Sequence, residues 1–227
     1  MPNQRFASCT DLALSRLRSV FTSALLVVFW SGCGSNTIVV HVPPRVDVNA
    51  MGTAGIIEFA SNSDHAIERH ATRQFQEHVQ AGQPGTRFIE LGTMDHVLAS
   101  VGATQLDPET IRKIGAKYGV AAVFVGEIAY SDPKTDIRLN DLTRLQGAVN
   151  TEIKGDISCR LLEAKSGASV WSSSAWAKRQ LGSVRVSSDG GISGRMSQSN
   201  PRYDMVPDMV YHLTSDFRPT TTRQRVK

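Results

Sequence analysis

The hydrophobic pattern at the start of the chain is that of an export signal. Arg5, Arg16 and Arg18 precede a mainly apolar run without charges over residues 20–30. This run suits the apolar segment of a signal peptide, which needs roughly 7–15 residues, whereas a helix that crosses a bilayer needs about 20. The pattern therefore predicts a signal peptide over residues 1–32.

After residue 54, short apolar runs alternate with amphipathic segments. The runs predict strands at 55–59, 87–91 and 121–128, and the last is apolar enough to lie at the centre of its sheet. Apolar residues that recur at three- and four-residue steps predict helices. We expect these helices over residues 64–79, 93–101, 108–118 and 201–217. The third has a strong start signal in Asp107-Pro108-Glu109, because a capping carboxylate is followed by proline at the first helical position.

An alternating pattern on both sides of Lys165-Ser166-Gly167 predicts a long antiparallel hairpin. Its strands are expected over residues 149–163 and 168–178. The segments 131–150 and 182–200 are polar, and the second is rich in Ser and Gly, so we expect loops there.

The ends of the folded part carry few structure signals. Residues 33–54 contain Pro43-Pro44 and predict a tether with an edge strand near 39–48, and residues 220–227 predict a frayed basic tail. A single domain is then expected over residues 55–219. Its order of elements predicts an α/β or α+β fold, a two- or three-layer sandwich with a mixed sheet, a long antiparallel hairpin and flanking helices.

Composition narrows the function classes only slightly. The chain has 227 residues and a net charge of +4, and removal of residues 1–32 would leave one well-cored domain with a net charge of +2. No basic run carries interleaved aromatic residues, so nucleic-acid binding is not expected.

The cysteines point to a lipid anchor. Trp30-Ser31-Gly32-Cys33 places small residues before a cysteine, which resembles the lipobox of bacterial lipoproteins, so Cys33 is the predicted lipidation site. An ordinary cleaved signal with an incidental Cys33 and an uncleaved anchor are the alternatives. Gly34 is not the Asp that retains such proteins on the inner membrane, which favours the periplasmic face of the outer membrane. Cys9 would leave with the signal, so Cys159 would be a lone, buried residue without a disulfide partner.

The folded part resembles a family of envelope lipoproteins. The resemblance rests on the strand at 55–59, the helix at 64–79, the block IGAKYGVAAVFVGEI (residues 114–128) and the block LLEAKSGASVW (residues 161–171). The resemblance covers roughly residues 50–217. In this part the chain resembles the curli-secretion (CsgG-like) lipoproteins and the penicillin-binding-protein activator (LpoB-like) lipoproteins. It also resembles the amino-terminal domain of TolB. The motifs are structural, so the resemblance implies a fold more than a function.

No pattern of catalytic or metal-binding residues stands out. The six histidines lack the spacing of a helical zinc site, and the segment 190–195 lacks the Gly-Lys-Ser/Thr end of a phosphate-binding loop. Ser172–Ser174 lack the turn of a nucleophile elbow, and Asp132, Asp136 and Asp141 are expected to be solvated. We therefore expect neither an enzyme nor a cofactor or a metal.

The function expected from the sequence is contact with other envelope proteins. The chain would be a non-catalytic lipoprotein, held on the membrane by its lipid, that serves secretion, cell-wall synthesis or envelope assembly, with a sheet edge or the helix at 201–217 as its contact surface. Two alternatives stay open. The first is a homo-oligomeric ring or pore subunit of an export channel, which the lack of an alternating apolar pattern in 131–150 and 182–200 disfavours. The second is a small-ligand-binding domain.

Overall fold

The computed structural model describes residues 37–141, 146–186, 191–196 and 199–225, and Cys33 lies outside these ranges. The chain forms two compact units, which divide near residues 40 and 220. The first unit contains most of β1 (Thr37–Val42) and β10 (Thr220–Arg225), which pair as a two-stranded sheet. The frayed tail predicted from residue 220 is therefore wrong up to Arg225, since pairing with β1 satisfies the backbone of this polar segment.

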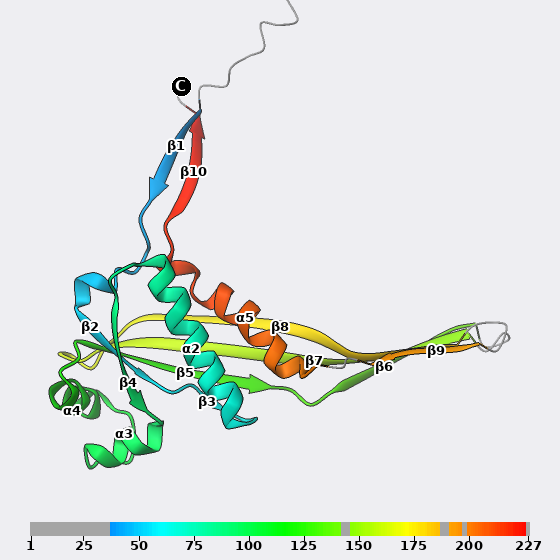
Figure 1. The fold of residues 1–227 in the computed structure, drawn as a ribbon, viewed down its shortest axis with the longest axis horizontal. Coiled ribbons are helices and arrows are strands. Elements are labelled where there is room, and N and C mark those ends of the chain that lie inside the picture. The colour runs from blue at the N-terminus through cyan, green and yellow to red at the C-terminus, as the bar shows by residue number, and fades with distance from the viewer. Residues whose placement is uncertain (1–36, 142–145, 187–190, 197–198, 226–227) are drawn as a thin grey trace, which may run out of the picture. The chain divides into compact units, whose positions relative to one another are not determined.

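The second unit is built on a mixed sheet of eight strands (Figure 1). Its strands are β2 (Thr53–Ile57), β3 (Ala60–Ser61), β4 (Arg87–Gly92), β5 (Ala122–Tyr130), β6 (Lys134–Asp141), β7 (Gln146–Glu163), β8 (Ser169–Val186) and β9 (Ile192–Met196). The order is β4-β2-β5-β7-β8-β9, with β3 beside β5 and β6 beside β7. The strands β2, β4, β3 and β5 pair in parallel, and the pairs among β5 to β9 are antiparallel. The predicted mixed sheet with a long hairpin is confirmed.

In the described part of the chain, four α-helices begin where the sequence places capping residues. They are α2 (His65–Gly82), α3 (Met94–Ser100), α4 (Pro108–Tyr118) and α5 (Pro201–Leu213). The side chain of Asp107 accepts a hydrogen bond from the backbone N–H of Thr110 at the start of α4, and Gly119 ends this helix in a left-handed conformation with φ of 66°. The helix predicted to extend to residue 217 stops at Leu213, and a short 3₁₀ helix follows at Ser215–Phe217.

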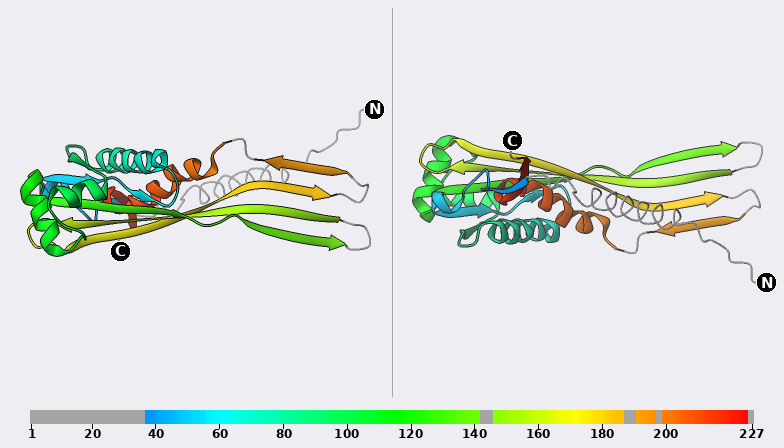
Figure 2. Two further views of the ribbon diagram at one scale, coloured as in Figure 1. Left: turned by 90° about the horizontal axis from the view of Figure 1, so that it is seen from below. Right: turned by 90° about the horizontal axis from the view of Figure 1, so that it is seen from above.

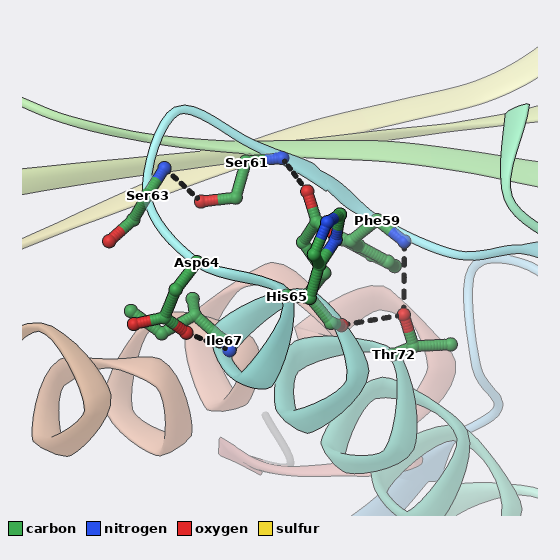
Figure 3. A network of polar contacts seen from close by, with 8 residues as sticks. Phe59, Ser61, Ser63, Asp64, His65, Ile67 and Thr72 are labelled. Carbon is green, nitrogen blue, oxygen red and sulfur yellow. Dashed lines mark hydrogen bonds and ion pairs between the residues drawn. The ribbon is translucent and has the colours of Figure 1, made fainter. Parts of the chain in front are cut away.

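The start of α2 is tied to the strand before it by polar contacts (Figure 3). The carboxylate of Asp64 accepts a hydrogen bond from the N–H of Ile67 at 2.9 Å, and the hydroxyl of Thr72 accepts one from the N–H of Phe59 at 3.0 Å. The same hydroxyl donates to the carbonyl of Glu68 at 2.8 Å. The first bond caps α2, and the bond from Phe59 joins the helix to the segment between β2 and β3.

Helices cover both faces of the sheet, so the sandwich has three layers. On one face, α2 and α5 bury an aromatic core in which the ring of Phe75 lies 5.1 Å from that of Phe124. On the other face, Val97 of α3 and Ile114 of α4 pack against Val123 of β5. Burial of apolar side chains on both sides explains why β2 and β5 are almost continuous apolar runs.

The two segments predicted to be loops, 131–150 and 182–200, form strands over most of their length. The strand β6 and the first part of β7 pair, and the last part of β8 pairs with β9. Figures 1 and 2 show these strands extending beyond the helices of the same unit. We call residues 134–141, 146–152, 182–186 and 192–196 the arm. The loop prediction is wrong because the charged residues that make these segments polar lie on one face of paired strands, and uncharged residues occupy the other face.

Candidate functional site

The arm has one uncharged and one charged face, because the four strands are in register. Ile137 of β6 lies opposite Val149 of β7, which lies opposite Val184 of β8. One step along, Thr135 faces Thr151, and their hydroxyl oxygens are 3.2 Å apart. Successive residues of a strand point to opposite faces, so these side chains share one face of the arm.

The uncharged face of the arm is open to solvent. The side chain of Ile137 is 64% exposed, that of Val184 is 43% exposed, and that of Ile192 on β9 is 76% exposed. Nearer the helices, the same side of β7 carries Ile153 and Ile157, which are buried in the core that α5 covers. The arm therefore continues an apolar face of the sheet beyond the helix that covers it. Exposed apolar groups that gather in this way are typical of contact sites.

The opposite face of the arm carries ion pairs. The guanidinium of Arg138 lies 2.8 Å from a carboxylate oxygen of Asp136, and the ammonium of Lys178 lies 3.1 Å from one of Glu152. Arg185 and Arg195 lie on this face as well, at exposed positions. Exposed pairs of this kind contribute only ~0–1 kcal/mol each to folding stability. The paired side chains of this face are exposed to solvent.

The outer edges of the arm are unpaired. Among the described residues, no strand pairs with the outer side of β6 or of β9. Such edges offer free backbone N–H and C=O groups to another strand. The directions of the four strands alternate, so β9 of one molecule could pair antiparallel with β6 of another.

The helix that was expected to form a contact surface has one face in the core. Its buried apolar residues are Met205, Val206, Met209, Val210 and Leu213. Tyr203 and Tyr211 of α5 are exposed, so the expectation for helix 201–217 stays a prediction. A further exposed apolar surface lies in the arm. A period-two pattern in KTDIRL and SVRV was the signal that could have found it.

Of the other residues considered from the sequence, Cys159 and Ser172–Ser174 lie on neighbouring strands and line one cleft. Cys159 is buried in β7, and burial raises the pKa of its thiol. Ser172–Ser174 lie within β8, and Asp136 pairs with Arg138. The described ranges contain no group of three or more His, Cys, Asp or Glu side chains that could hold a metal ion. None of the helices in these ranges is long and apolar enough to cross a membrane.

Comparison with known proteins finds solved structures that are similar to this chain with low TM-scores. No protein-family model matches the sequence, and no curated protein matches it. A PelC dodecamer from Paraburkholderia phytofirmans is 11% identical, with a TM-score of 0.39 over 80% of this chain and 97% of the other. Lipoprotein GNA1162 from Neisseria meningitidis is 14% identical, with a TM-score of 0.30 over 56% and 83%.

The LpoB-like part of the resemblance also finds a structural counterpart. The carboxy-terminal domain of LpoB from Salmonella enterica is 10% identical, with a TM-score of 0.33 over 56% of this chain and 82% of the other. Because all these TM-scores are below 0.5, no functional argument rests on them. The likeness to curli-secretion proteins and to TolB stays a prediction.

Proposed function

We propose that this chain is a non-catalytic lipoprotein of the bacterial cell envelope, anchored through Cys33 to the periplasmic face of the outer membrane. It acts through protein contacts, in secretion, cell-wall synthesis or envelope assembly. The observation that carries the proposal is the arm, whose exposed uncharged face is built from Ile137, Val184 and Ile192. Desolvation of such side chains is the main source of affinity in protein interfaces.

Photo-crosslinking from the arm tests this proposal. Ile192 and Ser193 are neighbours on β9 and are both exposed, but they lie on opposite faces of the arm. A benzophenone amino acid placed at 192 in the full chain is expected to give discrete adducts in membranes. The same group at 193 is the matched control and is expected to give few.

Competition shows whether the adducts are specific. Excess purified wild-type protein should suppress them about tenfold, whereas the Ile192→Lys protein should not, because a buried lysine would have to lose its hydration. Equal adducts from both positions, or adducts that Ile192→Lys protein suppresses as well, would contradict a contact through the uncharged face.

A second candidate function, a ring or pore subunit of an export channel, is favoured by the unpaired edges of β6 and β9. Pairing of these edges between copies would be a head-to-tail contact, and such contacts form a ring when the rotation between copies closes and an open filament when it does not. The uncharged and charged residues of β6 and β9 do alternate, but these strands have only eight and five residues, whereas a membrane-crossing strand needs about 9–11.

The mass of the full chain in detergent separates the two candidates. A ring subunit is expected to run at a high multiple of the monomer mass at micromolar concentration, because one head-to-tail contact leaves a free edge for the next copy. A monomer under these conditions would exclude the ring, and the contact proposal would stand.

A further inference from the structure

A cleft of about 560 Å³ lies beside α2, at the carboxyl ends of the parallel strands β2 and β4. The connection after β2 leads to α2 on one face of the sheet, and the connection after β4 leads to α3 and α4 on the other face. In open sheets with parallel strands, ligands bind outside the carboxyl ends of the strands. The cleft lies at this end of β2 and β4.

The walls of the cleft carry opposite charges. Arg69 and Arg73 line it from α2, whereas Glu58 follows β2 and Glu90 lies on β4. Within the described part of the chain, the side chains of Arg69, Glu58 and Glu90 form no ion pair, and Arg73 has one at 4.0 Å, with Glu77. A ligand with a single charge would be repelled by the wall that carries the same charge. A dipolar ligand would find a partner on each.

The floor of the cleft contains a histidine without hydrogen-bond partners. The side chain of His70 is buried, and neither of its ring nitrogens has a partner among the described residues. Buried polar atoms are nearly always paired, so this imidazole needs a partner that the described residues do not supply. Burial and the charge of Arg73 lower the pKa of His70, so the ring is neutral at pH 7, with one nitrogen as donor and the other as acceptor.

Tyr203 of α5 covers the histidine. The two rings are stacked with their centroids 3.9 Å apart and an angle of 11° between their planes, and the tyrosine is 37% exposed at the rim of the cleft. Solvent does not reach the imidazole nitrogens in this arrangement. A ligand would therefore reach them only after the exposed tyrosine or the long side chains of α2 turn aside, which exposed side chains do readily.

From these features we propose that the cleft binds a short peptide with a free amino group and a free carboxylate. Its carboxylate pairs with Arg69 and Arg73, and its ammonium group pairs with Glu58 and Glu90. The peptide groups between the two ends offer C=O acceptors and N–H donors, the kinds of group that the donor and the acceptor nitrogens of His70 can bind. This binding site is independent of the contact surface on the arm.

The test uses the purified mature protein and trialanine as the probe. Titration is followed by NMR through the ring signals of His70 and Tyr203, assigned by substitution of each residue. Three blocked forms serve as controls: N-acetyl-trialanine, trialanine amide and the peptide blocked at both ends. Trialanine is expected to bind about tenfold more tightly than either singly blocked form, because each block removes one charged hydrogen-bonded contact.

Charge-removing variants locate the site. Arg69→Gln should weaken binding of trialanine and leave that of trialanine amide unchanged. Glu90→Gln should weaken binding of trialanine and leave that of N-acetyl-trialanine unchanged. Arg87→Gln, on β4 but outside the cleft, is the matched control. Equal affinity for all four peptides, no shift of either ring signal at millimolar peptide, or an equal effect of Arg87→Gln would overturn the proposal.

Discussion

Replacement of Cys33 by serine is expected to release the protein from membranes. A lipobox cysteine is acylated through its sulfur, and a serine at this position would carry no lipid. Each buried CH₂ of an acyl chain contributes about 0.8 kcal/mol, so the loss of two or three chains removes more binding energy than the rest of the chain is expected to supply. The membrane-bound fraction should fall about tenfold or more on fractionation at high salt.

A second cysteine variant provides the control for this experiment. Cys159 is buried in β7, and Cys159→Ser should remain in the membrane fraction. Labelling with an alkyne fatty acid should mark the wild type and Cys159→Ser, but not Cys33→Ser. If Cys33→Ser stays labelled, the anchor is elsewhere. If it loses the label but stays in the membrane, the export signal is an uncleaved anchor.

Replacement of Gly126 by valine is expected to destabilise the fold strongly. Gly126 lies in the middle of β5, and a Cβ atom built there would overlap the ring of Phe59. That ring is fully buried and lies 5.5 Å from the ring of Phe75, so it has no free space to move into. Overpacking in a core typically costs about 1–3 kcal/mol, and the branched valine should lie at or above the upper end.

Urea denaturation measures this effect. The midpoint should fall markedly for Gly126→Val, whereas Gly194→Ala on β9 should change little, because the nearest atom to its added Cβ is 3.7 Å away. The double variant Gly126→Ala with Phe59→Leu should be less unstable than the sum of the two single variants, since the smaller side chain makes room for the methyl group. Additive effects would mean that the contact with Phe59 is not the cause.

The sequence by itself determined the parts of the fold that depend on local chemistry. Asp107-Pro108 and Gly119 mark both ends of α4, because capping and a left-handed glycine act within one turn of a helix. The four-residue steps of Ile67, Ala71 and Phe75 predicted the buried face of α2. The hairpin of β7 and β8 followed from alternation on both sides of a turn that ends in Gly167, whose φ is 77°.

Gly126 lies within an apolar strand pattern and Gly115 within a helical one, which indicates close packing against each, and the structure supplies the partners. At Gly126 the partner is Phe59, from a part of the chain 67 residues earlier. At Gly115 it is Ala164, which follows β7. A glycine in an apolar strand or helix indicates that something packs closely against it, but only the tertiary fold brings that group near.

Only the tertiary structure decided the features to which we assign function. In the arm, Ile137 lies between Asp136 and Arg138 and Val184 between Ser183 and Arg185, so each segment alone is mostly polar. Pairing across β6 to β9 places the apolar residues on one face, and this depends on register between distant segments. The cleft likewise joins β2, β4, α2 and α5, so no continuous stretch of sequence contains its pattern.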